Sequence, residues 1–235
     1  MKTTSCWGNP PQRIYSFMKK LSPEASVCIV GCSDGKFVLP FLRKGFRVTG
    51  IDFDKIAIHG GEKIKPIDRQ IISEKQYVPC KVKPQYDSLP TETIQIKGLL
   101  KRIEEEKLGK NFHLIQTDYY RNPPLEEFDV VFTSCSLQYK ANRDLSLVKM
   151  IDTLKNSVKP NGYLYMDYMM ALEDSHQWKA EQFLRTGQLK GFFLDGWEIC
   201  YIREKKQPVF EAAHIDRPED HFHRFGYVLA RKMKK

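Results

Sequence analysis

The sequence lacks the features that would place it in a membrane or in a secreted, disulfide-bonded class. None of its 235 residues falls within an apolar run of about 18 residues, the length that crosses a bilayer. The opening stretch MKTTSCWGNPPQ has no apolar core of the kind that a signal peptide needs. The six cysteines are scattered, mostly in apolar stretches, which favours reduced, buried thiols over a disulfide framework. We therefore expect a cytoplasmic protein with no membrane partner.

The sequence also lacks internal repeats and low-complexity tracts, and its composition is that of a globular protein. Apolar residues make up 41% of the chain and charged residues 29%. The length fits one domain with a sizeable core. The formal net charge of +9 suits an anionic partner, so nucleic acid stays among the candidates. Because lysines and arginines are spread along the chain, charge alone does not assign a partner.

Apolar periodicity predicts an alternation of strands and helices. The predicted strands cover 27–31, 46–52, 112–117, 128–134, 162–168, 197–203 and 223–232. The predicted helices cover 10–20, 35–44, 54–63, 93–108 (with Gly109 as its C-cap), 144–158 and 174–187. This alternation is typical of an α/β fold with a seven-stranded, mostly parallel sheet and helices on both faces. No helical segment separates the last two strands, so we expect an antiparallel C-terminal strand.

The stretch VCIVGCSDGKFVLPFLRKGFRVTGIDFD, residues 27–54, joins the first two predicted strands through a glycine-containing turn. Gly31 and Gly35 allow a tight turn and close approach to a ligand beyond the strand end. Asp52 ends the second strand about 20 residues after Gly31, where an acid can bind ribose hydroxyls. The pattern predicts an adenosine-bearing ligand, and the alternative is a tight turn with a helix-capping aspartate. NAD is disfavoured because Ser33 stands where a second glycine would admit the pyrophosphate.

Three further motifs follow in order: IQTDYY, FDVVFTSCSLQY and VKPNGYLYMDY. Together with VCIVGCSDG and VTGIDFD, they make the chain similar to the class I S-adenosylmethionine-dependent methyltransferases over nearly its whole length. The segment after the second strand and the ending AHIDRPEDHFHRFGYVLARK also look loosely similar to the thiopurine and tellurite-resistance-type small-molecule methyltransferases. The resemblance implies a Rossmann-like fold, with S-adenosyl-L-methionine as cofactor and S-adenosyl-L-homocysteine as product.

The resemblance assigns the first turn to the methionine part of the cofactor. The backbone around Gly31, Cys32 and Ser33 would lie against it, and Gly35 would open the following helix. The chain departs from the family pattern at two places. Ile29 stands where an acidic residue is usual, and Ser33 replaces the usual middle glycine. Both departures affect how the turn would hold the amino-acid end, and neither touches the ribose or adenine contacts.

The same resemblance assigns the adenosine contacts to the later motifs. Asp52 would bind the ribose hydroxyls and Phe53 would pack on the adenine. Asp118 would accept a hydrogen bond from the adenine amino group, with the Tyr119 backbone nearby. Two residues would lie beside the methionine and face the substrate: Ser134 and Cys135.

The expected organisation is a single methyltransferase domain over residues 1–235, with three segments outside the shared core. Residues 1–24 would form an N-terminal helix or lid, 64–92 an insertion, and 171–196 a substrate-side segment. Aromatic residues in the outer segments are weak candidates for the substrate side or lid: Trp7, Tyr15 and Trp178. For these side chains packing in the core is the competing interpretation.

A fixed catalytic residue is not required, because the sulfonium methyl is already activated and transfer depends mainly on positioning. If a base assists, the candidates are Tyr139, His214, His221 and His223. A surface pair or a structural hydrogen bond is the competing interpretation of the last two histidines. The His-x-His pattern has no matched third ligand, so no metal is expected.

These features favour methyl transfer to a sulfur, oxygen or nitrogen atom of a small molecule by in-line displacement. One alternative is an RNA or nucleoside methyltransferase, supported by the charge and by RNPPL at 121–125. The corresponding signature of base-methylating enzymes follows the fourth strand, whereas Asn122 precedes it, so we interpret RNPPL as a turn. The second alternative is a non-catalytic protein that binds the cofactor. The motifs leave the acceptor atom and the oligomeric state open.

Overall fold

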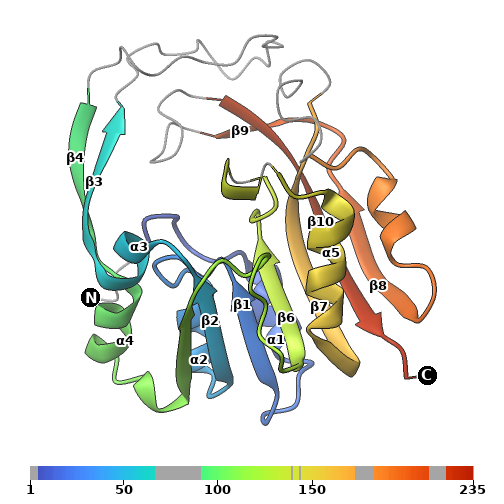
Figure 1. Cartoon of the computed structure of the whole chain (residues 1–235), viewed down its shortest axis with the longest axis horizontal. Coiled ribbons are helices and arrows are strands. Elements are labelled where there is room, and N and C mark those ends of the chain that lie inside the picture. The colour runs from blue at the N-terminus through green and yellow to red at the C-terminus, as the bar shows by residue number, and fades with distance from the viewer. Residues whose placement is uncertain are drawn as a thin grey trace.

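An eight-stranded sheet forms the centre of the molecule (Figure 1). The computed structural model describes residues 5–66, 91–138, 140–142, 144–172, 183–211 and 221–234. The sheet has the order β5-β2-β1-β6-β7-β10-β8, and β9 pairs with β10. Its strands are β1 (Ser26–Val30), β2 (Arg47–Asp52), β5 (Phe112–Gln116), β6 (Phe128–Ser134), β7 (Val158–Met170), β8 (Trp197–Glu204), β9 (Val209–Glu211) and β10 (His221–Lys232).

The pairing of these strands confirms the fold class expected from the sequence. β5, β2, β1, β6 and β7 are paired in parallel. β10 is antiparallel to both of its long neighbours, β7 and β8. The short strand β9 was not predicted, since three residues are too few to show an alternating pattern.

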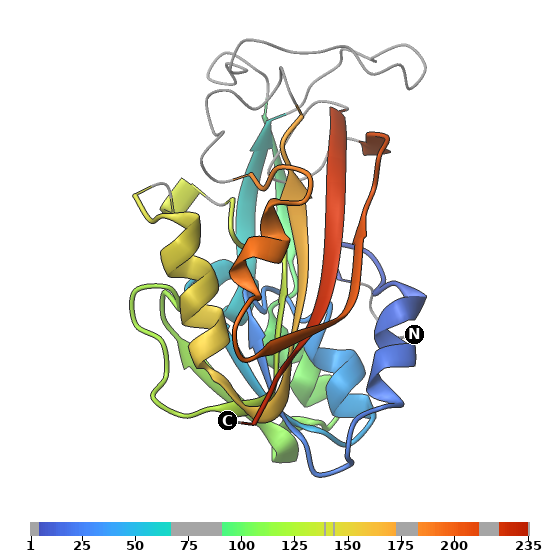
Figure 2. The same ribbon diagram turned by 90° about the vertical axis from the view of Figure 1, so that its right-hand side faces the viewer.

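Helices cover both faces of the sheet (Figure 2). On one face, α1 (Gln12–Met18), α2 (Val38–Arg43) and α4 (Leu99–Glu105) contribute buried side chains to one core cluster. On the other face, α5 (Leu147–Asn156) contributes to a second cluster. Among the described residues, no helix has the length and apolar character needed to cross a membrane.

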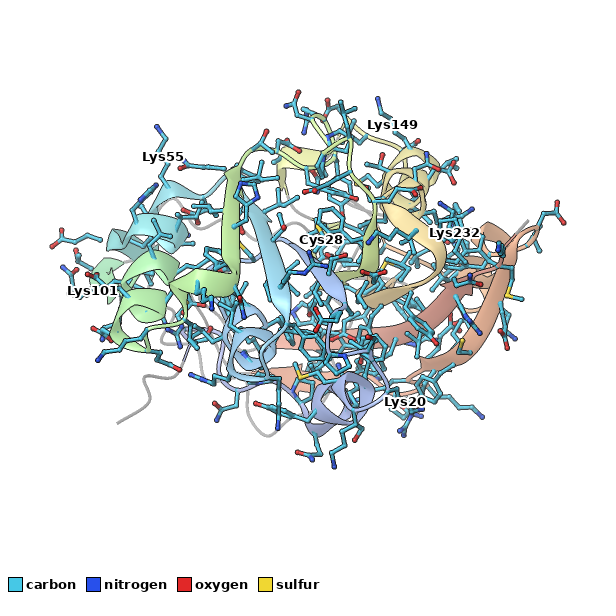
Figure 3. The ribbon with its side chains drawn as sticks, turned by 90° about the horizontal axis from the view of Figure 1, so that it is seen from below. Lys20, Cys28, Lys55, Lys101, Lys149 and Lys232 are labelled. Carbon is cyan, nitrogen blue, oxygen red and sulfur yellow. The ribbon has the colours of Figure 1, made fainter. Side chains whose placement is uncertain are left out.

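The alternation of side chains along β1 separates the two clusters. Val27 and Ile29 belong to the cluster under α1 and α2, whereas Cys28 and Val30 belong to the cluster under α5. This is the period of two expected for a strand buried on both faces. Figure 3 shows Cys28 in the centre of the sheet, with the labelled lysines on the periphery: Lys20, Lys55, Lys101, Lys149 and Lys232.

The predicted helix 54–63 is wrong in its second half. Helix α3 covers only Lys55–His59, with Asp54 as N-cap accepting hydrogen bonds from the amides of Ile56 and Ala57. Gly60 ends the helix with φ 87°, a conformation that favours glycine. Residues Gly61–Pro66 then form strand β3.

The predicted helix 93–108 is wrong in its first part. Thr91–Ile96 form strand β4, which pairs antiparallel with β3 in a separate two-stranded sheet. The helix begins only at Leu99, because Gly98 lies against the end of α3. A Cβ on Gly98 would lie 2.1 Å from the amide nitrogen of Gly60. Figure 1 shows β3 and β4 rising beyond the ends of β1 and β2.

The C-cap predicted at Gly109 is also wrong. Helix α4 ends at Glu105, and Lys107 takes the left-handed conformation with φ 56°. The Leu108 amide donates to the Ile103 carbonyl over 3.0 Å, which closes the helix end as in a Schellman motif. Gly109 instead begins a short 3₁₀ turn.

The predicted helix 174–187 reaches the described residues only at 183–187, which are not helical. Leu184 forms an isolated parallel bridge with Met170. Both side chains are buried in the α5-side cluster. The remainder of this prediction lies outside the described residues.

Substitution of Gly226 by alanine should weaken the β7–β10 pairing. A Cβ at Gly226 would lie 2.1 Å from Cζ of the buried Tyr168, its cross-strand partner. We expect a loss of about 1–3 kcal/mol in unfolding free energy, measured by urea denaturation. Gly191→Ala is the control, because a Cβ there meets nothing within 4 Å. Equal stability of the two variants would contradict the packing described.

Candidate functional site

A cleft of about 270 Å³ lies beyond the carboxyl ends of the parallel strands. Its lining residues come from the N-terminal segment, the ends of β1, β2 and β6, the residues after β5, and the β3–β4 ribbon. They are Cys6, Trp7, Val30, Gly31, Ser33, Ile51, Asp52, Phe53, Asp54, Ala57, Lys63, Ile96, Thr117, Asp118, Tyr119, Tyr120, Ser134, Ser136 and Asn142.

The turn after β1 brings backbone to the cleft wall. Gly31 and Ser33 have positive φ angles of 71° and 46°. The amides of Gly31 and Cys32 both donate to the carbonyl of Ile51, over 2.9 and 3.1 Å. The turn is therefore tied directly to the end of β2.

Asp52 provides the second tie between the turn and β2. Its carboxylate accepts hydrogen bonds from the amides of Ser33, at 2.7 Å, and Asp54, at 2.9 Å. Burial raises the pKa of the Asp52 carboxyl above its ordinary value, while these two amides act in the opposite direction. Each carboxylate oxygen can accept a further hydrogen bond, so Asp52 can hold the loop and still bind a ligand.

Phe53 presents an aromatic surface to the cleft. Its side chain lines the cleft and is 52% exposed, which is unusual for a large apolar residue next to the core. The neighbouring Asp54 is fixed as the N-cap of α3 and by an ion pair with Lys63 at 2.6 Å. That ion pair joins β3 to the residues that follow β2.

Asp118 lines the cleft after β5, the strand next to β2 in the sheet. Its carboxylate accepts from the amide of Tyr120 at 3.1 Å and pairs with Arg121. Arg121 also donates to the Ala141 carbonyl at 2.8 Å and pairs with Asp144. These contacts hold the loop after β5 against the loop after β6.

Two tyrosines after Asp118 form the floor of the cleft. Tyr119 donates to Ser157 at 2.7 Å, and the Tyr120 and Ser136 hydroxyls lie 2.5 Å apart. Burial raises the pKa of both phenols well above the ordinary value. They therefore line the cleft as neutral groups.

Residues 5–8, which we call the N-terminal strap, are fixed over the turn by Asp34. This buried carboxylate accepts from the Ser5 hydroxyl at 2.5 Å and the Cys6 amide at 2.7 Å. It also pairs with the buried Arg102 of α4 at 2.8 Å. Both carboxylate oxygens of Asp34 are engaged.

Two side chains of the strap reach the cleft. The Trp7 indole donates to the Ser33 hydroxyl at 2.9 Å, so its ring closes one side of the cleft. Partial burial and the nearby Asp34 carboxylate raise the pKa of the Cys6 thiol to about 12. Cys6 is therefore a neutral wall of the cleft and a poor nucleophile.

The structure brings together most of the cofactor residues predicted from the sequence. Seven of them line the cleft: Gly31, Ser33, Asp52, Phe53, Asp118, Tyr119 and Ser134. Cys32, Gly35 and Cys135 do not. The Cys32 side chain is buried in the core, and a Cβ on Gly35 would lie 2.6 Å from Leu99 of α4. Gly35 thus serves close packing.

Of the predicted substrate and base residues, one lines the cleft, two lie away from it, and the side chains of the other four are not described. Trp7 lines the cleft, whereas Tyr15 lies on α1 and packs against the core. His223 is buried with its ring 5.6 Å from that of Phe225, and it does not line the cleft. The backbone of His221 lies in β10. Three candidates lie outside the described residues: Tyr139, Trp178 and His214.

Within the described ranges, no group of three or more histidine, cysteine, aspartate or glutamate side chains is placed to hold a metal ion.

The described part of 171–196 packs on the α5-side core instead of the cleft. Phe183, Leu189 and Phe193 are buried there.

Sequence analysis missed several lining residues. Tyr120 and Ser136 stand inside the quoted motifs, and their hydroxyls were the available signal. Lys63 and Ile96 lie on β3 and β4, where a helical pattern was inferred. Lys63 and Ile96 reach the cleft because β3 pairs with β4, and the local periodicity of the sequence did not reveal this pairing.

Sequence analysis also missed a buried polar cluster next to Ser134. Asp167 of β7 is 4% exposed, and its Oδ2 pairs with Arg13 of α1 at 2.7 Å. The Ser134 hydroxyl lies 3.4 Å from the same oxygen. Burial raises the pKa of Asp167 to about 6, although Arg13 and Ser134 lower it.

Comparisons with known proteins show which folds this chain shares. No protein-family model matches the sequence, and no curated protein matches it. Among solved structures, TehB from Haemophilus influenzae is similar with a TM-score of 0.65 and 16% identity. The match covers 95% of this chain and 62% of TehB, so this chain spans less than two thirds of that protein.

Two more structures are similar over most of their length. Magnesium protoporphyrin IX methyltransferase from Synechocystis PCC 6803, solved with bound S-adenosylmethionine, has a TM-score of 0.55 and 14% identity, covering 94% of this chain and 78% of that one. The [4+2]-cyclase SpnF has a TM-score of 0.59 and 13% identity, covering 95% and 81%. At these identities the matches show a shared fold, and that fold carries more than one kind of chemistry.

The buried Asp167 should make stability depend on pH. Its folded-state pKa lies above the unfolded value of about 3.9, so its ionisation costs stability; this cost is absent below about pH 4 and complete above about pH 6. Relative to Asp167→Asn, the native protein should lose about 2–3 kcal/mol of unfolding free energy across this window. Urea denaturation at stepped pH measures the difference.

Asp129→Asn is the matched control for this experiment. Asp129 lies on β6 with hydrogen bonds to Ser26 and Lys159, and its pKa is lowered. The difference in unfolding free energy between Asp129→Asn and the native protein should not change with pH above about pH 5. A flat difference for Asp167→Asn as well would contradict the raised pKa.

Proposed function

We propose that this chain binds S-adenosylmethionine in the cleft and transfers its methyl group to a small-molecule acceptor. One observation carries the proposal. Asp52 at the tip of β2 and Asp118 after β5 line one cleft, together with the positive-φ turn after β1. These are the groups that a ribose, a purine and an amino-acid tail require at the carboxyl edge of a parallel sheet.

The lining residues fit each part of this cofactor. Asp52 has lone pairs left for the ribose hydroxyls after its two amide hydrogen bonds. The exposed ring of Phe53 offers a stacking surface for the purine. Asp118 offers a carboxylate for the amino group of the purine, and the Gly31 to Ser33 backbone offers a wall for the methionine part.

The chemistry requires few catalytic groups from the chain. The bound cofactor would supply an activated methyl group on a sulfonium sulfur. The protein residues must position the acceptor and exclude water. The N-terminal strap serves the second requirement, because Trp7 is held at the cleft wall by Ser33 and the strap by Asp34.

A small acceptor suits this site better than a nucleic acid. The cleft of about 270 Å³ would be occupied largely by the cofactor itself, and the strap and the β3–β4 ribbon contribute to its walls, which leaves little room for a large acceptor. Among the solved structures of similar fold, magnesium protoporphyrin IX methyltransferase supports a small acceptor, while SpnF is a cyclase, so the fold also carries another chemistry. The net charge of +9 keeps RNA as the second candidate acceptor.

Asp52→Asn should weaken cofactor binding by about tenfold to a hundredfold, since a charged hydrogen bond is worth about 1.5–3 kcal/mol. The asparagine keeps one acceptor oxygen for the turn after β1. Isothermal titration with S-adenosylmethionine and S-adenosylhomocysteine measures the effect. Asp129→Asn, at the other end of the sheet, should bind as the native protein does. Equal affinities of native protein and Asp52→Asn would refute the ribose contact.

A panel of acceptors with radiolabelled S-adenosylmethionine tests the transfer. We expect label in a thiol, phenol or amine of low molecular mass, and none in RNA. RNA binding that falls steeply with salt, together with label in RNA, would favour the nucleic-acid alternative. Tight cofactor binding with no labelled acceptor would favour a binding protein or another reaction.

A further inference from the structure

Asp167 is buried directly next to Ser134, which lines the cleft, and is not itself a lining residue. Ser134 lines the cleft at the end of β6, and its hydroxyl is 3.4 Å from Oδ2 of Asp167. The two residues are register partners in the parallel β6–β7 pair. The amide of Cys135 donates to the Asp167 carbonyl at 2.8 Å, which fixes the chain after β6 against β7.

Groups from every neighbouring element face this carboxylate. Arg13 of α1 pairs with it and lies over the Tyr227 ring of β10 at 3.9 Å. Arg13 also donates to the Tyr165 hydroxyl at 2.9 Å. The remaining facing groups are the Ser134 hydroxyl at the end of β6 and the Lys36 ammonium before α2.

One oxygen of Asp167 has no partner in this cluster. Oδ1 is buried and makes no hydrogen bond, while Oδ2 receives Arg13 and Ser134. The contrast with Asp34 is informative, because that equally buried carboxylate uses both oxygens for the strap and Arg102. A purely structural ion pair gains nothing from an unsatisfied buried oxygen, which costs free energy.

We propose that Oδ1 of Asp167 accepts the proton of the acceptor, and that the acceptor is therefore a molecule whose nucleophilic atom carries a proton. Phenols, thiols and amines belong to this class, whereas sulfides and selenides do not. The inference rests on the proposed methyl transfer and names the acceptor class for that same site.

The step balances without any further reagent. The nucleophilic atom of the acceptor bonds to the methyl carbon while the carbon–sulfur bond breaks and leaves its electron pair on sulfur. The proton of the acceptor passes to Oδ1, so the sulfonium charge and the carboxylate charge disappear together. Arg13 keeps Oδ2 hydrogen-bonded throughout and is a positioning residue.

The protonation state of Asp167 sets the pH dependence of methyl transfer. With its pKa near 6, the carboxylate is ready to accept a proton above that pH. Transfer to phenol should therefore rise with pH to a plateau above about pH 7, because phenol itself ionises only near pH 10. Removing the Arg13 charge should move this rise to higher pH.

The first experiment compares native protein, Asp167→Asn and Asp129→Asn with phenol as acceptor from about pH 5 to 8.5. Asp167→Asn should lose roughly a hundredfold or more in kcat and lose the rise with pH. Asp129→Asn should keep both. S-adenosylhomocysteine affinity should be equal in all three, which separates this effect from damage to the cofactor site. An Asp167→Asn variant that keeps the rise near pH 6 would overturn the proposal.

A second measurement does not depend on turnover. Calorimetric binding of phenol to the S-adenosylhomocysteine complex should tighten as the pH rises through 6 in the native protein, since the charged carboxylate then accepts the hydroxyl hydrogen bond. Asp167→Asn should show no such change. If that variant fails to fold, Arg13→Gln serves instead, and its binding transition should move upward in pH. A transition that stays in place would overturn the proposal.

A comparison of acceptors separates this inference from the proposed function. Phenol, thiophenol and benzylamine should accept label from S-adenosylmethionine, and dimethyl sulfide should not. Transfer to dimethyl sulfide alone would overturn the role of Asp167 and leave methyl transfer intact. Failure of the native protein to bind S-adenosylmethionine would overturn both.

Discussion

Carboxylates that accept hydrogen bonds from backbone amides hold the loops of this protein at the edge of its sheet. Asp52 is the central case, because its two oxygens bind the amides of Ser33 and Asp54. The turn after β1 contains positive φ angles that an unsupported chain would rarely keep. Without Asp52 the turn would keep only its hydrogen bonds to the Ile51 carbonyl, and Ser33 would lose its tie to β2.

The same device fixes the N-terminal strap. Asp34 joins the strap, the turn and α4 through Ser5, Cys6 and Arg102. A buried ion pair contributes little net stability, because desolvation offsets its Coulomb attraction. Its contribution here is geometric, because it fixes Asp34, which holds the strap and so places Trp7 at one side of the cleft. One side of the cleft is thus formed by an N-terminal segment that hydrogen bonds hold against the turn after β1.

The two ends of the cleft have different chemical character. One end, where we propose that adenosine binds, combines the carboxylates of Asp52 and Asp118 with the exposed ring of Phe53, and these groups suit hydroxyls, an amine and a flat ring. Beside the other end lies Asp167, whose burial keeps its proton affinity high while Arg13 keeps it oriented. A fold shared with both a methyltransferase and a cyclase can acquire its chemistry through such local differences.

The sequence by itself determined the parallel sheet, the antiparallel last strand and most of the predicted residues that line the cleft, because strand period, glycine turns and strand-end acids are local patterns. Tertiary structure decided the rest. Residues 93–96 carry apolar positions compatible with either period, and only pairing with β3 makes them a strand. Arg13 and Asp167 are 154 positions apart in the sequence. Their ion pair, and the burial that leaves Oδ1 of Asp167 without a hydrogen bond, arise only when α1 packs on β7. No local pattern encodes a contact between such distant residues, since it arises from sheet register and helix docking together.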